Sequence, residues 1–557
     1  MDTQTRNKVR MLILLGLLLL PIIFALFTAI DLEYSWLKKF AYLSVVLTLL
    51  AIPALFLKAR IYFLLEGIFN FLFFPIDIAS LYLNRQPTSS SFLQNIFETN
   101  FSEAFELIRS TWQFAIVVIL LWGVYFVLAF RVENRPLFSR KACKWILGLA
   151  SCLFVVGTMT MMVLLKQFHS ERTIKNTLLD AVGLVWVKLY KIYPYNLYIE
   201  SFDLMQSRHE QVRMQEQIAS FHFGIDPISC EELELYVLVI GETARYDHFG
   251  INHYERNTTP LLQQHTNLIS YDSAFSQANL TASSLPLLVS RATAKNSQLA
   301  YGEKSLPEAF QEAGFKTGWL TKQVPYPFVE RIMDACDYSK FYSKGIDVSG
   351  NYDEELVSTL HSFTEDTLQF FVLHSLGCHF RYEQRYPKSF EKFQPTLGGS
   401  FTYAMISEAN QEPLVNAYDN AILYTDFFLH KLINYLDSLN RPAVMLYMAD
   451  HGESFWDDDR KLALHGSYQT SEYEYHVPLL IWYSEEYEAA HPEKVQAMRQ
   501  NKTTPVSSDV VFYSMLDLAG IEDIVDSTRS ICSTSLVPAD TIWVITGSGS
   551  VEAMPIR

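Results

Sequence analysis

The sequence predicts a protein of two parts, an α-helical membrane domain followed by an α/β domain with a mainly parallel sheet. Apolar runs of membrane-spanning length crowd the first third of the chain, and after about residue 232 strand-like runs alternate with helical segments. The length of 557 residues also exceeds what one hydrophobic core usually holds. We expect residues 1–166 to form the membrane domain, 167–231 interfacial and bridging helices, and 232–557 the α/β domain.

The membrane domain is expected to contain five transmembrane helices, each near the roughly 20 apolar residues that a bilayer requires. The first run has no small-residue cleavage site and four more follow, so we interpret it as a retained span rather than a signal peptide. An N-terminus in the cytoplasm places ten Lys and Arg inside and four outside, as the positive-inside rule expects. Five crossings then deliver the rest of the chain to the far side. The apolar runs lie at about 11–30, 40–57, 61–84, 113–130 and 145–165.

Two features of this half bear on the membrane surface. Glu66 and Asp77 lie within the third run, where a charge is costly; they either help to seat a lipid head group, or lie near an interface or pair inside the bundle. Residues 184–202 are dense in Trp and Tyr, which favour the head-group layer. We expect this segment to hold the second domain close to the bilayer, with packing in a core as the alternative.

The charge balance differs between the two parts. Residues 1–170 contain 15 Lys and Arg against 9 Asp and Glu, and the remainder contains 29 against 51, which together give the formal net charge of −16. An acidic soluble part argues against a nucleic acid as partner, but it does not exclude an anionic lipid substrate. The six cysteines are widely spaced and form no CxxC pair, so we expect no thiolate zinc site and few or no disulfides.

The α/β domain is predicted from buried apolar runs that alternate with amphipathic segments. This order favours a largely parallel sheet with helices on both faces. We expect strands at 236–240, 316–320, 369–374, 443–449 and 478–483, a late edge strand at 541–547, and helices at 281–292, 305–313, 353–362, 412–438 and 507–519.

Chemically useful side chains follow two of these strands directly. Glu242 follows 236–240 and a turn at Gly241, where open α/β sheets bind ligands; by itself it could equally cap a helix. Asp450 and His451 follow 443–449, and an oxygen beside an imidazole nitrogen suits a divalent metal. The three residues supply three ligands for a tetrahedral zinc and leave the fourth position open for a nucleophile or water.

Several motifs occur together in a specific order. They are VIGET-x-R-x-DHFG, Y-x-R-N-T-T-P, Gly377-Cys378-His379, Arg385-Tyr386-Pro387 and ADHGES. With them, nearly the whole chain resembles the phosphoethanolamine transferases of Gram-negative envelopes, in the alkaline phosphatase/sulfatase superfamily. The resemblance implies a monomeric, multi-pass inner-membrane protein with a periplasmic sulfatase-like catalytic domain that binds one Zn²⁺, a second ion being the alternative.

The resemblance also implies which residues act. It places the nucleophilic, metal-bound threonine at Thr281, where we expect the hydroxyl to cap a helix and to face free backbone N–H groups. Capping alone is the alternative role, and Ser283 and Ser284 are competing nucleophiles. His379 and His465 match histidines that face the substrate phosphate. We expect His374, His430 and His476 on the surface, and Asp457, Asp458 and Asp459 in a solvated loop.

The reaction implied by the resemblance has two steps. Thr281 takes phosphoethanolamine from phosphatidylethanolamine, and a lipid A phosphate or a lipopolysaccharide core sugar then accepts it. A phosphoglycerol transferase of the same superfamily is the nearest alternative. A sulfatase or phosphatase is more distant, because no CxPxR-type segment is present. A non-catalytic scaffold or lipid-binding membrane protein is disfavoured by the intact Glu242, Asp450 and His451.

Overall fold

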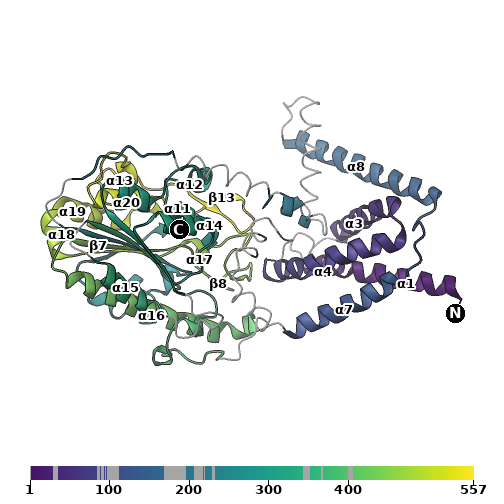
Figure 1. The fold of residues 1–557 in the computed structure, drawn as a ribbon, viewed down its shortest axis with the longest axis horizontal. Coiled ribbons are helices and arrows are strands. Elements are labelled where there is room, and N and C mark those ends of the chain that lie inside the picture. The colour runs from purple at the N-terminus through teal and green to yellow at the C-terminus, as the bar shows by residue number, and fades with distance from the viewer. Residues whose placement is uncertain are drawn as a thin grey trace. The chain divides into compact units, whose positions relative to one another are not determined.

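The computed structural model describes residues 2–28, 36–84, 112–168, 220–228, 233–342, 352–364, 368–398 and 405–556, with isolated positions between 88 and 218. The chain forms two compact units (Figure 1). One comprises Met1–Ile96 with Thr111–Ser207, and the other Phe97–Ser110 with Arg208–Arg557.

The first unit is helical. Three of its stretches, Gln4–Thr28, Ala59–Leu81 and Arg140–Thr160, are long and apolar enough to cross a membrane, and Tyr42–Phe56 and Ile116–Phe130 are shorter apolar helices. All five overlap the apolar runs of the sequence, whereas five crossings remain a prediction. The helices are α1 (Thr3–Leu18), α2 (Leu20–Thr28), α3 (Trp36–Phe56), α4 (Ala59–Asn84), α7 (Trp112–Phe130) and α8 (Arg140–Phe168).

The two acidic residues of α4 are both buried in this unit. One Asp77 oxygen accepts hydrogen bonds from the Thr88 N–H at 3.1 Å, the Thr88 hydroxyl at 3.0 Å and the Asn196 amide at 2.8 Å. Asp77 therefore pairs inside the unit, as one of the two interpretations expected. Most of the predicted interfacial segment 184–202 and of the bridging region lies outside the described residues.

The second unit is built on a seven-stranded sheet of order β2-β10-β7-β1-β6-β4-β5. Neighbouring strands are parallel except around β10, which is antiparallel to both β7 and β2. The predicted mainly parallel sheet is therefore confirmed, with one reversed strand. The strands are β1 (Leu235–Gly241), β2 (Leu268–Ser270), β4 (Lys316–Thr321), β5 (Tyr338–Phe341), β6 (Gln369–His374), β7 (Ala443–Ala449) and β10 (Leu479–Tyr483).

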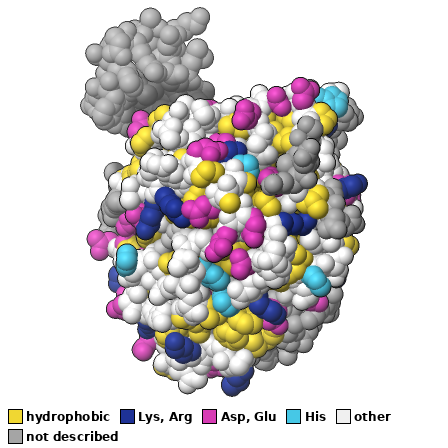
Figure 2. Space-filling model, turned by 90° about the vertical axis from the view of Figure 1, so that its left-hand side faces the viewer, with side chains coloured by type: hydrophobic (Ala, Val, Ile, Leu, Met, Phe, Trp, Pro, Cys, Tyr) yellow, Lys and Arg dark blue, Asp and Glu magenta, His cyan; other side chains and the backbone are white. Residues whose placement is uncertain are grey.

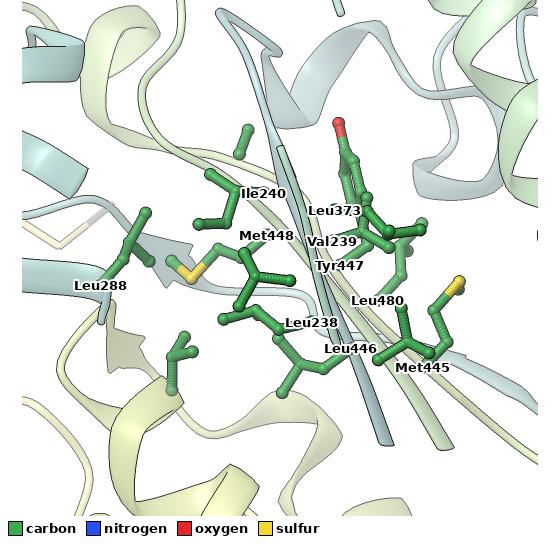
Figure 3. Packing of buried hydrophobic residues seen from close by; sticks show 14 of the residues in the cluster. Leu238, Val239, Ile240, Leu288, Leu373, Met445, Leu446, Tyr447, Met448 and Leu480 are labelled. Atoms are coloured by element: carbon green, nitrogen blue, oxygen red, sulfur yellow. The ribbon is translucent and has the colours of Figure 1, made fainter. Parts of the chain in front are cut away.

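The centre of this sheet is apolar on both faces. Every residue of β1 and β7 is buried, which explains why each reads as a continuous apolar run. Val239 pairs with Tyr447 and Ile240 with Met448, so successive side chains alternate between the faces (Figure 3).

Helices cover both faces of the sheet, as predicted. In Figure 1, α15 and α16 lie on one side, and α13, α19 and α20 lie on the other. The helix predicted at 281–292 ends earlier, at Leu288. The helices of this unit are α11 (Thr281–Leu288), α12 (Leu299–Gly302), α13 (Leu306–Glu312), α14 (Pro327–Ala335), α15 (Glu354–Phe363), α16 (Gln411–Asp437), α17 (Glu472–Tyr475), α18 (Glu485–Ala490), α19 (Pro492–Gln500) and α20 (Val510–Leu518).

The edges of the main sheet differ from the prediction. The strand expected at 541–547 exists as β12 (Ile542–Ile545), but it pairs with β13 (Val551–Met554) in a separate hairpin. The edges are instead β2 and β5, whose short runs are only partly buried. Two further two-stranded ladders pair β3 (Ala274–Phe275) with β11 (Val506–Ser507), and β8 (Ser454–Phe455) with β9 (Ala463–Leu464). The described cysteines, Cys143, Cys152, Cys336, Cys378 and Cys532, are free thiols.

Candidate active site

Two neighbouring strands bring the predicted metal ligands together. β1 and β7 are parallel and pair in register as far as Gly241 and Ala449. The next residues, Glu242 and Asp450, therefore leave the sheet side by side at its carboxyl edge, and His451 follows Asp450. Potential ligand atoms of these three side chains all lie within 4.8 Å of one another.

Backbone geometry holds this cluster in place. Thr243 adopts a left-handed conformation with φ of 55°, which is uncommon for a residue with a branched side chain. In this conformation its N–H donates to Asp450 Oδ1 at 3.0 Å, and its hydroxyl donates to Glu242 Oε1 at 2.5 Å. Gly377 packs from the other side, where a Cβ would come within 2.8 Å of the Glu242 carbonyl oxygen.

The protonation of the cluster suits a cation. The Nδ1 of His451 lies 2.9 Å from the Gly452 carbonyl, which can only accept a hydrogen bond, so Nδ1 carries the hydrogen and Nε2 keeps its lone pair. Nε2 lies 3.6 Å from Glu242 Oε1 and 3.5 Å from Asp450 Oδ2. Burial lowers the pKa of His451 to about 4, so the ring is neutral at neutral pH.

Neither carboxylate forms an ion pair with a Lys or Arg in the part of the chain that the structure describes. Burial and the charge of Glu242 raise the pKa of Asp450, whose Oδ2 is buried without a hydrogen-bond partner. For Glu242 burial acts in the same direction, but His451 and His379 hold its pKa below the usual range. One neutral imidazole and two buried carboxylates form a donor set that fits a divalent zinc.

The Thr281 hydroxyl completes the cluster. Its Oγ1 lies 3.2 Å from Glu242 Oε2 and 3.2 Å from His451 Nε2. The prediction that Thr281 caps the helix is wrong by one residue, because the extended Leu280 is the N-cap of α11 and Thr281 is its first helical residue. The hydroxyl is consequently not used in a side-chain cap and faces the carboxylate instead.

The two competing serines occupy other positions. Ser284 is buried, and its hydroxyl donates to the Asp450 carbonyl at 2.7 Å, which ties α11 to the loop after β7. Ser276 donates to the same carbonyl. The backbone N–H of Ser283 bonds to Leu280, and no side-chain contact to the cluster is described for it. Thr281 is therefore the hydroxyl that the fold places against the predicted ligands.

The two predicted substrate histidines differ in how the structure places them. The ring of His465 lies over that of His451 with centroids 4.2 Å apart, and its Nδ1 is 3.1 Å from Glu453 Oε1. Burial opposes protonation, but Glu453 raises the pKa of His465 to about 9. The half-buried His379 has its Nδ1 3.3 Å from the Phe380 carbonyl, and it is one of the histidines that lower the pKa of Glu242.

The sequence did not predict a role for three residues around the cluster, namely Gln323, Tyr382 and Glu453. Glu453 is fully buried and also accepts the Tyr382 hydroxyl at 2.8 Å, so it orients His465. Gln323 donates to Glu242 Oε2 at 2.7 Å. The DHGES motif already contained Glu453, and its place three residues after Asp450 was a usable signal. Nothing in the sequence marked Gln323, because it lies in a loop after another strand.

The remaining polar residues are mostly structural. His374 was expected on the surface but is only 2% exposed at the end of β6, where β1 and β4 flank it. His430 pairs with His265 at 2.9 Å, and His476 stacks on Tyr246 with centroids 4.2 Å apart. In the acidic loop, Asp457 pairs with Arg245 and Asp458 with Arg460, while Asp459 is exposed.

The Y-x-R-N-T-T-P motif stabilises the loop after β1. The Thr258 hydroxyl accepts the Gly250 N–H at 3.0 Å, and Arg256 pairs with Asp419 of α16 at 2.8 Å. The motif therefore fastens this loop to a helix, and its described contacts do not reach the metal cluster. Figure 2 shows one face of the molecule, on which acidic and basic side chains are interspersed among apolar ones.

Comparisons with known proteins agree with this geometry. Residues 234–521 match the family model of the sulfatases, and residues 88–177 match that described as phosphoethanolamine transferase EptA/EptB. The Kdo(2)-lipid A phosphoethanolamine 7''-transferase of Escherichia coli (strain K12) is 31% identical over 278 residues, 48% of this chain and 47% of that protein. The chain thus spans about half the length of this curated relative in the match.

Two solved structures share the fold. The integral membrane lipooligosaccharide phosphoethanolamine transferase A of Neisseria meningitidis superposes with a TM-score of 0.66 at 20% identity, covering 93% of this chain and 98% of that one. The C-terminal periplasmic domain of EcEptC from Escherichia coli, in complex with Zn, gives 0.53 at 24% identity and covers 59% of this chain and 95% of that one.

Proposed function

The chain belongs to the sulfatase family, and we propose that it is a zinc-dependent phosphoethanolamine transferase. The observation that carries this proposal is the Thr281 hydroxyl, 3.2 Å from both Glu242 Oε2 and His451 Nε2, beside two buried carboxylates with which no Lys or Arg of the described residues pairs. The matched relative transfers phosphoethanolamine according to its name, and the N-terminal match covers part of the membrane half.

Zinc is the metal that the donor set favours, held by Glu242, Asp450 and His451 with the Thr281 oxygen as the fourth ligand. Bound zinc would lower the pKa of the threonine hydroxyl and offset charge on the phosphoryl oxygens. One ion accounts for this cluster, and it is the only group of three or more potential ligands found among the described residues.

In the first step, the Thr281 hydroxyl gives up its proton to solvent, and its oxygen attacks the phosphorus of phosphatidylethanolamine in line with the leaving oxygen. The new Oγ–P bond forms as the bond to diacylglycerol breaks. His465, kept protonated by Glu453, is placed to give its proton to the leaving alkoxide. His379 is proposed to contact a phosphoryl oxygen. The phosphoethanolamine group is left on Thr281.

In the second step, an acceptor oxygen attacks the same phosphorus and the Oγ–P bond breaks. The acceptor is a lipid A phosphate or a lipopolysaccharide core hydroxyl, and His465, now neutral, can take the hydroxyl's proton. Because the group waits on Thr281, donor and acceptor need not be bound at once. With a hydroxyl acceptor the two steps return His465 to its protonated state, whereas with a phosphate acceptor His465 regains its proton from solvent.

The architecture suits lipid substrates. We propose a membrane domain of five spans over residues 1–166, interfacial and bridging helices over 167–231, and a catalytic domain over 232–557. The protein would then be a monomer of the bacterial inner membrane with its catalytic domain in the periplasm. An anchored site meets its donor and acceptor lipids by diffusion in two dimensions.

Purified full-length protein tests the proposal directly. Incubation with zinc and phosphatidylethanolamine alone should release diacylglycerol and add one phosphoethanolamine to the peptide containing Thr281. Phosphatidylglycerol should give neither product, whereas a phosphoglycerol adduct would indicate the related transferase. Mass spectrometry of lipid A and core from cells with and without the protein then identifies the acceptor. Diacylglycerol release only when acceptor is present, with no adduct, would contradict the two-step route.

A further inference from the structure

Gln323 touches the predicted zinc ligand Glu242 from outside the cluster. Its side-chain nitrogen donates to Glu242 Oε2 at 2.7 Å and to the Ser375 carbonyl at 2.9 Å. Both partners are acceptors, so the nitrogen, not the oxygen, of the amide must face them. The two N–H groups of one amide are therefore both used, which fixes the plane of this side chain.

The backbone of Gln323 is itself held at the sheet edge. Its N–H donates to the Thr321 hydroxyl at 3.0 Å, and that hydroxyl lies 3.1 Å from its carbonyl oxygen. Thr321 ends β4, Ser375 follows β6 and Glu242 follows β1, three strands that are neighbours in the sheet. The amide thus joins the ends of three adjacent strands at the position of one carboxylate.

The contact between Gln323 and Glu242 suits a carboxylate that binds a metal ion. Besides the Thr281 hydroxyl, Glu242 receives hydrogen bonds from the Gln323 amide on Oε2 and from the Thr243 hydroxyl on Oε1, and all three donors are neutral. A Lys or Arg in the same place would neutralise the carboxylate and repel a cation. Among the described residues no Lys or Arg forms an ion pair with Glu242. A neutral donor fixes the orientation of the carboxylate and leaves its negative charge for the ion.

We propose that Gln323 is a positioning residue that sets the geometry in which Glu242 binds zinc. The proposal rests on the proposed zinc site and adds the residue that prepares it. Hydrogen-bonded partners of metal ligands typically change metal affinity by about 10–100-fold when they are removed. Gln323 is expected to act in this range, through Glu242 rather than through substrate.

The test compares Gln323→Met with wild type in the full-length, detergent-solubilised protein. Methionine has a similar unbranched shape but no N–H donor. Zinc affinity is measured by competition with a chelator of known affinity, and the melting temperature of the metal-free protein is measured in parallel. We expect zinc to bind about 10–100-fold more weakly with the metal-free melting temperature unchanged. Gln496→Met, at an exposed position of α19, is the matched control and should bind zinc as wild type does.

The possible results separate this inference from the proposed function. Equal zinc affinity in wild type and Gln323→Met would overturn the role of Gln323 alone. A lower melting temperature of the metal-free variant would show a merely structural role, and unchanged affinity with a higher KM for the donor lipid would show a substrate contact; either overturns it. A wild-type protein that binds no zinc would overturn the proposed metal site and this inference with it.

Discussion

The segments that follow β1 and β7 carry acidic side chains at two levels, one beside the strand ends and one a few residues further along, and these two levels have different partners. Next to the strands, Glu242 and Asp450 lie beside each other, and no Lys or Arg of the described residues forms an ion pair with either of them. A few residues further along the same loops, Asp247 and Asp457 are bridged by Arg245 at 2.6 and 2.9 Å. The pair with its own cation is structural, whereas the pair without Lys or Arg is the one proposed to hold zinc. Buried charges are costly unless they are paired, so this difference supports the proposed site.

The largest effect is expected when the Thr281 hydroxyl beside Glu242 is removed. Thr281→Ala should reduce transfer by at least about 10³-fold, because the covalent step has no other nucleophile. Its melting temperature should stay close to wild type, since Thr281 is not the N-cap of α11. Transfer is measured as diacylglycerol release from phosphatidylethanolamine, with Ser283→Ala as the control that should remain active. A folded Thr281→Ala protein with wild-type transfer would refute the assignment.

Removal of the metal should affect the acidic residues beside the strand ends and not those paired with arginine. Chelation should abolish transfer, and added zinc should restore it and raise the melting temperature, because a ligand that binds only the folded state stabilises it. In Asp450→Asn the zinc-induced rise should disappear, whereas in Asp458→Asn, in the arginine-paired loop, it should persist. Differential scanning fluorimetry with and without zinc measures both. An equal zinc-induced rise in melting temperature in the two variants would contradict the role of Asp450 as a zinc ligand.

Breaking the ion pair between Arg245 and Asp457 should lower the free energy of unfolding and leave zinc affinity unchanged. Arg245 is 2% exposed, and its Nη1 donates to Asp457 Oδ1. Asp457→Asn removes the charge while keeping the shape, and we expect a loss of about 1–3 kcal/mol in the free energy of unfolding. Zinc affinity should stay the same. Urea unfolding and a zinc titration on the same protein check the two halves, and a change confined to zinc affinity would be the contrary result.

The smallest expected effect concerns pH. Burial lowers the pKa of His374 from 6.5 to about 4, so the unfolded chain binds a proton before the folded protein does. The contribution of His374 to stability is thus complete above pH 6.5 and falls as the pH drops from 6.5 towards 4, by about 1.4 kcal/mol per unit. Between pH 6.5 and 5, His374→Leu should be less sensitive to pH than wild type by roughly 1–2 kcal/mol. Unfolding curves at both pH values measure this, and equal slopes would contradict a buried neutral ring.

Much of the central sheet could be predicted from the sequence. The runs at 369–374 and 443–449 coincide with β6 and β7, because strands buried on both faces are mostly apolar. The edge strand β5 could not be found in this way, since Tyr338–Phe341 includes exposed polar residues and is only partly apolar. The strand near 542 was found, but its partner was not, because pairing depends on the tertiary position of a hairpin.

The site was predictable where chemistry follows a strand directly. Glu242, Asp450 and His451 were identified from their position after apolar runs, and the fold brings them together. The resemblance to a family placed Thr281, while its contacts depend on the extended Leu280 before α11. Gln323 and Tyr382 were not identifiable, since a single amide or phenol in a loop has many possible partners. The burial of His374 was not predicted, because a single histidine at the end of an apolar run does not indicate which neighbouring strands will cover it.

The cluster is assembled from parts of the chain that are far apart in sequence. Thr281 lies 39 residues from Glu242 and 170 from His451. Because a ribosome makes the chain from its N-terminus, the threonine and its first carboxylate emerge long before the Asp450–His451 pair. An incomplete chain therefore carries a threonine of ordinary reactivity and no complete ligand set. In the proposed reaction, the nucleophile is therefore activated only after β7 has paired with β1 and brought Asp450 and His451 beside Glu242.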